Sequence, residues 1–244
     1  MVAHMISDSV PWRDELGKVA RQLRGRENQK RWTERTAYLI ERDLMMGMFA
    51  IRRLIESGKC SSRLPKRRIP AQLATLTGRE PDLIDRWTPW EHYDLDNARS
   101  IELNVWSLAQ QFIHSFILML DVAENGVTLT GVFVGSDFTK RSHLYRVDLQ
   151  TIIDLFEYVA REGVMHSSIY RRDGTNTRFT ISQHDLVEVG LAEYDNADQD
   201  YVRFLDAIHD DATVRAAFPE LGDYEVTRMR TPSWNNKTER LREV

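Results

Sequence analysis

The chain has 244 residues, 42% of them hydrophobic and 29% charged, so it can bury one large core or two small ones. It holds one cysteine and no run of about 18 apolar residues, which excludes an intrachain disulfide, a thiolate zinc site and a membrane-spanning helix. Asp8, Pro11 and Trp12 stand where a signal peptide would need an apolar core. We therefore expect a cytoplasmic protein without a metal or a cofactor.

Charge is distributed unevenly along the chain. Residues 1–68 hold 16 Lys and Arg against 8 Asp and Glu, whereas the remainder holds 17 against 29. This asymmetry favours docking of opposite faces within the fold or between subunits. The alternative is that the basic N-terminal part binds nucleic acid. We accordingly predict self-association or a protein partner, with RNA as the second candidate partner.

Two helices are predicted in the N-terminal part. Ser9 and Pro11 are typical of a helix start, and apolar residues recur at helical spacing until Gly25. A longer helix is predicted from about residue 28 or 31 to Ser57, with Gly58 as its C-terminal stop. Its apolar stripe is wide, which predicts burial on two sides: Ile40, Leu44, Met48, Ile51 and Ile55, with Tyr38, Met45 and Phe49 beside them.

Residues 58–70 are predicted to form a linker, because prolines and small residues interrupt any regular pattern. The linker includes a basic triplet at 66–68, which could contact phosphate but is also common in solvated loops. Farther along, Trp87, Trp90 and Tyr93 fall within seven residues. These rings predict either a loop that pins the next helix or a surface for a ligand or a base.

Residues 97–115 are predicted as one helix around which the rest of the chain is organised. Apolar residues recur at steps of four, three and four: Ile101, Val105, Leu108 and Phe112. Beside them runs a row of polar but uncharged residues: Ser100, Asn104, Ser107, Gln111 and His114. Uncharged polar groups are cheaper to bury than Lys, Glu or Arg when they find hydrogen-bond partners. The row therefore predicts a polar seam between helices or a functional site.

The pattern changes from helix to strand after this row. Residues 116–122 are apolar on both faces, which predicts a central strand. Asn125 and Gly126 predict a two-residue type I′ hairpin turn into a returning strand at 127–134. A third strand is expected at 143–147, giving a three-stranded meander.

The fold class predicted from these elements is α+β. A helix capped by Asp148 and ending near Gly163 should cover the meander, and a second hairpin is expected at 168–182. We divide the chain into a helical portion at 1–115, an antiparallel sheet with helices at 116–230 and a loose tail at 231–244. The segment from 185 to 225 is strongly acidic and is expected to hold one more helix.

Several catalytic signatures are absent from the sequence: the glycine-rich phosphate loop, the dinucleotide fingerprint, and the zinc-protease and esterase motifs. Asp206, His209 and Asp210 bring possible metal ligands together, but an acidic helix surface is the favoured interpretation. No metal site is therefore predicted.

Residues 109–115 resemble the end of the signature helix of HEPN-type helical ribonucleases. Gln110 matches the polar position of that helix and His114 matches its histidine, whereas Ala109 occupies the arginine position. The resemblance implies RNA cleavage with His114 as general acid or base, and the missing cation would have to come from Lys140, Arg141 or the basic triplet. The alternative for His114 is a helix-end residue that hydrogen-bonds neighbouring backbone. The helical N-terminal part, this helix end and the Asn-Gly hairpin are together similar to bacterial proteins of unknown function.

The leading functional prediction is a bacterial-type binding or regulatory protein that acts through its charge-segregated surfaces. A degenerate HEPN-like RNA-processing enzyme centred on His114 is the first alternative, and a small-molecule sensor using Trp87 and Trp90 is the second. The candidate catalytic residue is His114. The candidate binding residues are Asn104, Ser107, Gln110, Gln111, Trp87, Trp90, Lys140 and Arg141.

Overall fold

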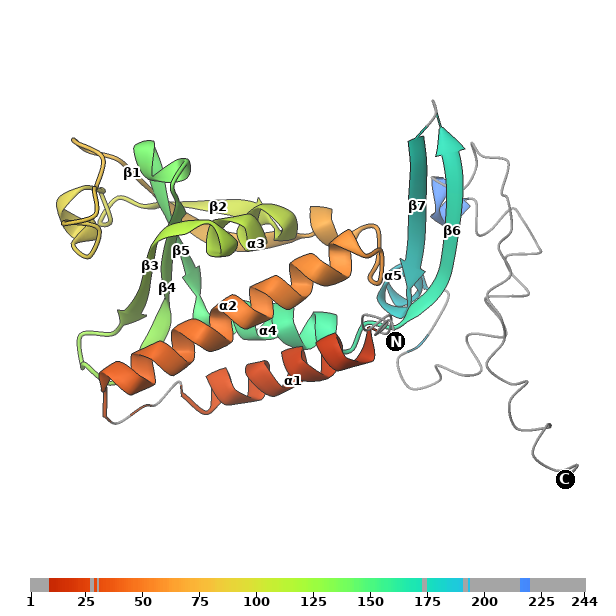
Figure 1. Cartoon of the computed structure of the whole chain (residues 1–244), viewed down its shortest axis with the longest axis horizontal. Coiled ribbons are helices and arrows are strands. Elements are labelled where there is room, and N and C mark those ends of the chain that lie inside the picture. Colours follow the sequence, from red (N-terminus) through yellow and green to blue (C-terminus); the bar gives the residue numbers. More distant parts are fainter. Residues whose placement is uncertain are drawn as a thin grey trace, which may run out of the picture.

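The structure is a computed structural model that describes residues 9–26, 29, 31–172, 175–190, 193 and 216–219. Helices combine with a five-stranded antiparallel sheet, so the predicted α+β class is confirmed (Figure 1). No helix in the described ranges is both long and apolar enough to cross a membrane. The acidic segment after residue 193, including Asp206 and His209, lies outside the described residues except for 216–219, and so does the C-terminal tail.

The sheet has the strand order β2-β1-β5-β4-β3. Its strands are β1 (Arg68–Thr75), β2 (Arg99–Asn104), β3 (Ser115–Val122), β4 (Leu129–Ser136) and β5 (His143–Asp148). The predicted meander of β3, β4 and β5 is confirmed. The prediction of a central strand at 116–122 is wrong, because β3 lies at the edge of the sheet and its side chains are mostly only half-buried. β1 and β2 come from the portion that the sequence predicted to be helical, so the sheet takes strands from both sides of the expected boundary at residue 115.

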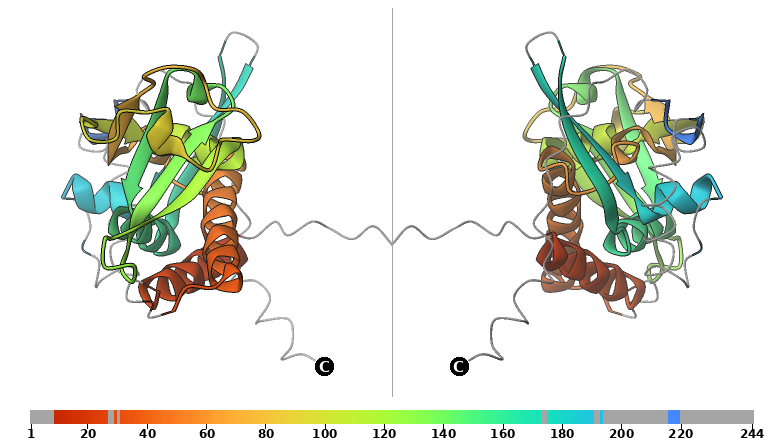
Figure 2. Two further views of the ribbon diagram at one scale, coloured as in Figure 1. Left: turned by 90° about the vertical axis from the view of Figure 1, so that its left-hand side faces the viewer. Right: turned by 90° about the vertical axis from the view of Figure 1, so that its right-hand side faces the viewer.

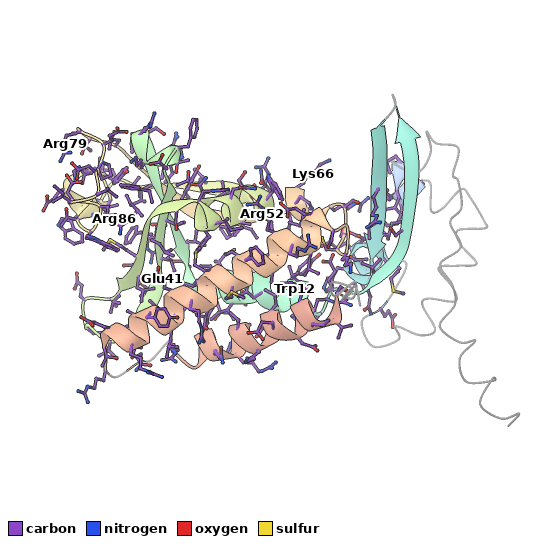
Figure 3. All side chains as sticks on the ribbon, viewed as in Figure 1. Trp12, Glu41, Arg52, Lys66, Arg79 and Arg86 are labelled. Carbon is purple, nitrogen blue, oxygen red and sulfur yellow. The ribbon has the colours of Figure 1, made fainter. Side chains whose placement is uncertain are left out.

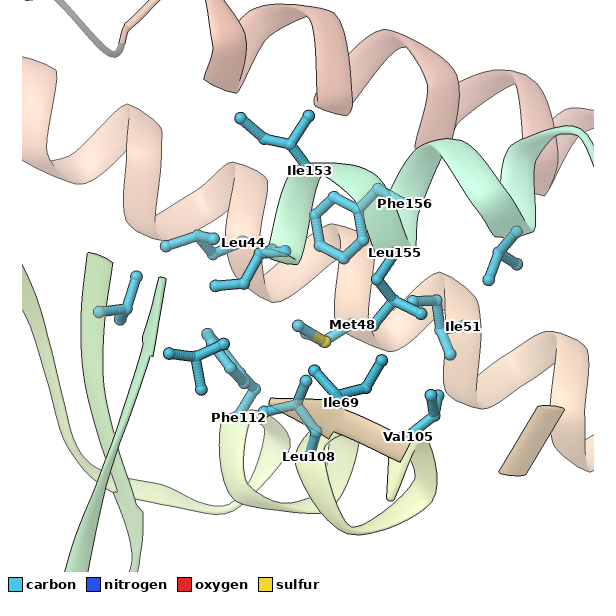
Figure 4. Packing of buried hydrophobic residues seen from close by; sticks show 14 of the residues in the cluster. Leu44, Met48, Ile51, Ile69, Val105, Leu108, Phe112, Ile153, Leu155 and Phe156 are labelled. Atoms are coloured by element: carbon cyan, nitrogen blue, oxygen red, sulfur yellow. The ribbon is translucent and has the colours of Figure 1, made fainter. Parts of the chain in front are cut away.

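The described part of the body has four α-helices: α1 (Val10–Arg24), α2 (Glu34–Glu56), α3 (Val105–Ile113) and α4 (Leu149–Ala160). α3 and α4 pack on strands of the sheet, whereas α1 and α2 pack mainly on other helices. The inward side chains of all four share one apolar core with β1, β4 and β5 (Figure 4). Phe112 and Phe156 are completely buried at its centre. Gly47 lets α2 approach α4 closely, because a Cβ at this position would overlap the ring of Phe156. The two predicted N-terminal helices are therefore confirmed, with α2 capped by the Thr33 side chain.

The predicted helix at 97–115 is wrong in its first half. Residues 99–104 form β2, which pairs with β1 from Arg68↔Asn104 to Leu73↔Arg99. The Asn104 side chain then accepts a hydrogen bond from the Ser107 N–H at 2.7 Å and starts α3. Pairing with β1 overrides a helical spacing that runs by chance across the junction of strand and helix. The polar row is thus divided between two elements and does not lie along one helix.

The Asn125-Gly126 turn also differs from the prediction. The hairpin closes between Ala123 and Thr128, whose N–H···O distance is 2.8 Å, and the Gly126 N–H donates to the Ala123 carbonyl. The loop therefore has four residues, with Gly126 at a φ of 67°. Asn125 contributes its side-chain oxygen, which accepts from the N–H groups of Val127 and Thr128. The type I′ prediction failed because it did not include this side-chain cap.

The structure also corrects the predicted linker at 58–70 and the predicted cap of α4 by Asp148. The predicted linker at 58–70 contains the short helix η1 (Leu64–Lys66), and its last residues already belong to β1. Asp148 holds the N-cap position of α4 but makes no side-chain cap. Its carboxylate accepts instead from the Arg146 guanidinium at 2.6 Å.

The described residues after α4 form a separate unit beside the main body, which we call the hairpin unit. This hairpin unit consists of β6 (Val164–Arg172), β7 (Thr175–Ser182) and α5 (Gln183–Glu188). It has a small apolar cluster of its own, formed by Phe179, Ile181, Leu186 and Phe218. The predicted second hairpin is confirmed, and it stands at the opposite end of the molecule from the loop between β1 and β2 (Figures 1 and 2).

Candidate functional site

Gln111 and Asn104 of the polar row, and the neighbouring Gln110, make contacts that serve the fold. Gln111 is buried, and its Oε1 accepts hydrogen bonds from the Ser136 N–H at 2.9 Å and the Thr139 hydroxyl at 2.8 Å. Asn104 caps α3 through Ser107, as described above. Gln110 is half-buried, and its backbone carbonyl accepts from the His114 N–H at 3.0 Å. These contacts tie α3 to its neighbours and leave His114 as the exposed end of the row.

His114 is exposed and has a cation beside it. Nη1 of Arg52 lies 3.4 Å from Nε2 of His114, and Nε of Arg52 donates to Glu56 at 2.7 Å. Figure 3 shows Arg52 on α2, away from the loop that carries Arg79 and Arg86. Sequence reasoning missed Arg52, because a helix–helix contact between residues 62 positions apart leaves no local signal.

The two cations expected to assist His114 have other partners. Nζ of Lys140 lies 3.5 Å from the centre of the Phe116 ring and 2.8 Å from the Asp137 carboxylate. Nε of Arg141 lies 3.5 Å from the Glu80 carboxylate. The structure therefore places Arg141 against the loop between β1 and β2, and Lys140 against β3 and its own turn.

That loop, at 76–98, presents large apolar side chains to solvent. Five of them are more than half exposed, and we call them together the loop surface: Leu83, Ile84, Trp87, Trp90 and Phe138. Ile84 is 89% exposed and Phe138 is 84% exposed, so neither is covered by its own loop. The first four come from the β1–β2 loop, whereas Phe138 comes from the turn after β4. Leu83, Ile84 and Phe138 were missed at the sequence level, because isolated apolar residues in loops are common.

Hydrogen bonds hold this loop against the turn that follows β4. The Tyr93 ring is buried, and its hydroxyl donates to the Lys140 carbonyl at 2.7 Å. Burial raises the pKa of Tyr93 well above its ordinary value. The Leu76 N–H also donates to the Ser142 carbonyl at 2.9 Å. On the inner side, Tyr93 packs with Ala74, Ile117 and Leu144 in a cluster separate from the main core. The loop is therefore fixed from inside while its outer side chains stay exposed.

Charged groups around the loop surface are largely paired with one another. The Arg86 guanidinium stacks 4.4 Å from the Trp87 ring and 5.9 Å from the Phe116 ring. Arg79 pairs with Asp82 at 2.8 Å and also with Asp85. Residues 77–98 and 137–141 together hold four Lys and Arg against seven Asp and Glu. The border of the loop surface is consequently acidic, which disfavours polyanionic partners.

A second group of interest lies between the body and the hairpin unit. Glu162 is 1% exposed; its Oε1 accepts from the Ser61 N–H at 2.9 Å, while its Oε2 has no hydrogen-bond partner among the described residues. Asp185 is also buried and accepts from the Ser61 hydroxyl at 2.8 Å and from the Ser182 N–H at 2.8 Å. Two buried carboxyl groups thus share the same serines.

Burial raises the pKa of Glu162 to about 7, and the Asp185 carboxyl adds to this rise. The Ser61 N–H, the nearby Ser182 hydroxyl and the Arg13 guanidinium oppose it. The adjacent Cys60 is buried as well, and burial raises the pKa of its thiol, so Cys60 is not an activated nucleophile. This group of residues had no sequence signal, because the carboxyl groups are ordinary until the fold buries them.

A cavity of about 510 Å³ lies beside Cys60 and Ser61. Hydroxyl groups, the Cys60 thiol and one guanidinium are in its wall, which includes Ser57, Cys60, Ser61, Ser62, Thr180 and Arg178. A second cavity, of about 200 Å³, lies on the sheet near Gln72 and Arg146. Neither cavity has His114, Trp87 or Trp90 in its wall, and the sensor hypothesis for the tryptophans stays a prediction.

Within the described part of the chain, no three His, Cys, Asp or Glu side chains are grouped so that they could hold a metal ion. Comparison with protein-family models, with curated proteins and with solved structures found no match to this chain. The loop surface has the strongest features of a binding site, the His114–Arg52 pair has two groups of a possible catalytic site, and the Glu162 junction has a buried titratable group.

Proposed function

We propose that this protein is a binding protein that docks another protein through its loop surface. The observation that carries the proposal is the exposure of five large apolar side chains, four on the β1–β2 loop and Phe138 in the turn after β4, which a buried hydrogen bond ties together. Exposed apolar groups of this size are unfavourable in water unless a partner covers them. Aromatic anchors surrounded by polar groups are also typical of the energetic centre of protein interfaces.

The charges favour a partner segment that combines apolar side chains with Lys or Arg. Acidic residues outnumber basic ones around the loop surface, and Arg79, Lys140 and Arg141 already pair with carboxylates. A nucleic acid or an anionic membrane would meet few unpaired cations there. A basic segment would gain from the acidic border and would pack its apolar side chains on Trp87 and Ile84. The basic N-terminal part of a second copy meets this description, so self-association belongs among the outcomes of the test.

Selection of displayed random peptides on the purified protein tests the proposal. Selected peptides should be rich in apolar residues and in Lys or Arg. Their binding should fall at least tenfold in an Ile84→Ser, Trp87→Ser double variant, because interface anchors commonly contribute more than about 1.4 kcal/mol each. Tyr38→Ser is the matched control, since Tyr38 is 61% exposed and lies on α2, outside the loop surface. Peptides rich in Asp or Glu, or binding unchanged in the double variant, would contradict the proposal.

Sedimentation of the full chain over a range of concentrations shows whether the occupant is a second copy. Association that disappears in the Ile84→Ser, Trp87→Ser variant but persists in Tyr38→Ser identifies the copy as the partner. A monomer at all concentrations directs the search to the selected peptide sequences instead.

A second candidate function, RNA cleavage, is favoured by the contact between His114 and Arg52. A histidine can transfer a proton, and a neighbouring guanidinium can stabilise the charge of a phosphate in the transition state. Arg52 would then supply the cation that Ala109 does not. Cleavage of labelled RNA by the purified protein should be lost in His114→Ala and Arg52→Gln and kept in Arg53→Gln, which alters the next arginine on α2. Equal cleavage by the wild type and His114→Ala would dismiss this function.

A further inference from the structure

The hairpin unit is attached to the body mainly through polar contacts. Its apolar cluster around Phe179 and Ile181 is separate from the core of the body. The contacts between the two parts include hydrogen bonds, one ion pair and one ring stack. The Ser62 N–H donates to the Thr180 carbonyl at 2.9 Å, and the Gln183 N–H donates to the Gly163 carbonyl at 2.8 Å. Arg67 pairs with Glu188 at 2.7 Å, and the rings of Tyr158 and His184 stack with their centres 4.1 Å apart. A small polar contact of this kind permits relative motion of the two parts.

Glu162 lies at the centre of this contact. It follows α4, accepts from the turn after α2 through Ser61 and lies beside Asp185 of α5. Both the turn and α5 therefore reach the same buried carboxyl group. We call Ser61, Glu162, Ser182 and Asp185 the junction.

The unpartnered Oε2 of Glu162 makes the junction sensitive to a proton. When Glu162 is neutral, the buried oxygen needs no counter-charge. When Glu162 is ionised, a negative charge lies in a site that excludes water, next to the carboxyl of Asp185 and without a donor on Oε2. Separation of the hairpin unit from the body would let water reach this charge.

Other titratable groups around Glu162 do not replace it in this role. Tyr158 and Cys60 face the carboxyl, but burial raises the pKa of each, so both stay neutral. Arg13 on α1 donates to the Glu162 backbone carbonyl and is the nearest cation. His184 contacts the Tyr158 carbonyl at 2.8 Å, and burial lowers its pKa. Because burial disfavours the charged imidazole, protonation of His184 would favour release of the hairpin unit at low pH, which is the opposite direction to Glu162.

We propose that Glu162 is a proton-dependent clamp, which holds the hairpin unit on the body when protonated and releases it when ionised. Release would take Thr180 and Arg178 away from Ser57, Ser61 and Ser62, and so widen the 510 Å³ pocket that these residues line. The clamp stands independently of the loop surface, which lies at the other end of the molecule.

Cys60 provides the measurement, because it is the only cysteine of the chain and is 3% exposed at the same contact. Its rate of labelling by dithiodipyridine, divided by the rate in denatured protein at the same pH, gives the open fraction. A carboxyl whose pKa changes from about 7 when closed to about 4.5 when open predicts an open fraction that rises about 70-fold from pH 5 to pH 8. The rise should level off above about pH 7.

Two variants and one internal reference complete the test. Glu162→Gln should remove the rise attributed to Glu162. Glu157→Gln on α4, which removes a carboxylate paired with Arg24 of α1, should keep it. Opening measured at Cys60 should exceed opening measured by hydrogen exchange of β4 amides, because the body stays folded. A wild-type open fraction that does not rise with pH, or equal opening at Cys60 and in β4, overturns the proposal even if Glu162→Gln fails to fold.

Discussion

Substitution of Gly47 by alanine should destabilise the protein, although alanine normally stabilises a helix. In the interior of an exposed helix, the change from glycine to alanine contributes about 1 kcal/mol of stability. At position 47 the new Cβ would overlap Cζ and Cε2 of Phe156, a completely buried ring on α4. Forcing extra volume into a packed core typically costs about 1–3 kcal/mol. Because this overlap is severe and the ring has no open space, we expect a net loss of about 1–2 kcal/mol.

Gly17 on α1 offers a matched control for this substitution. A Cβ there would lie 3.5 Å from the Arg21 guanidinium and 3.6 Å from the Ala160 methyl, which are ordinary contacts. Gly17→Ala should therefore raise the free energy of unfolding by about 0.5–1 kcal/mol. Urea unfolding of both variants measures the change in the free energy of unfolding, which should be negative for Gly47→Ala and positive for Gly17→Ala.

A double variant shows whether Phe156 is the cause. In Gly47→Ala, Phe156→Leu the smaller side chain makes room for the new methyl group, so the two substitutions should not add and their coupling should be about 1 kcal/mol or more. If Gly47→Ala is as stabilising as Gly17→Ala, the close packing of α2 on α4 is wrong. The arrangement of the whole core in Figure 4 would then need revision.

Three further predictions concern pH, a buried amide and a helix cap. The pKa of Glu162 is about 7 in the fold against 4.5 for the free group, so its neutral form contributes about 3 kcal/mol of stability below pH 4.5. That contribution should disappear as the pH rises to about 7, and unfolding curves of Glu162→Gln should lack the loss. Gln111→Leu removes the acceptor for Ser136 and Thr139 and should cost about 1–3 kcal/mol in urea unfolding. Thr33→Ala removes the cap of α2 and should lower the free energy of unfolding by about 1 kcal/mol. In urea unfolding the midpoint should fall while the slope stays unchanged.

Local signals in the sequence were reliable where an element is decided by its own residues. Helix α1 begins at the predicted serine and proline, and α2 ends before a glycine with a φ of 62°. The meander and its covering helix also follow from alternation and spacing. β1 and β2 escaped detection because their stability comes from pairing with each other and with β5, at separations that a local window does not include.

The candidate sites were harder to predict for the same reason. Trp87 and Trp90 were recognised from their clustering, but the roles of Lys140 and Arg141 depend on a turn about 50 residues away from these tryptophans. The burial of Glu162 depends on α5 and on the turn after α2 together. Neither arrangement corresponds to a fixed spacing along the chain, so no sequence motif predicts it.

The charge asymmetry of the sequence can now be related to particular contacts. Arg24 of α1 pairs with Glu157 of α4 at 2.9 Å, and Arg67 pairs with Glu188 of α5 at 2.7 Å. Part of the basic N-terminal charge is therefore used to hold the acidic remainder of the same chain. These pairs are partly exposed and contribute about 1 kcal/mol or less each, so they orient the parts more than they stabilise them. The acidic border of the loop surface pairs with Lys140 and Arg141, but its described ion pairs include none with the basic N-terminal part. That is why a basic partner segment is the one we expect to bind there.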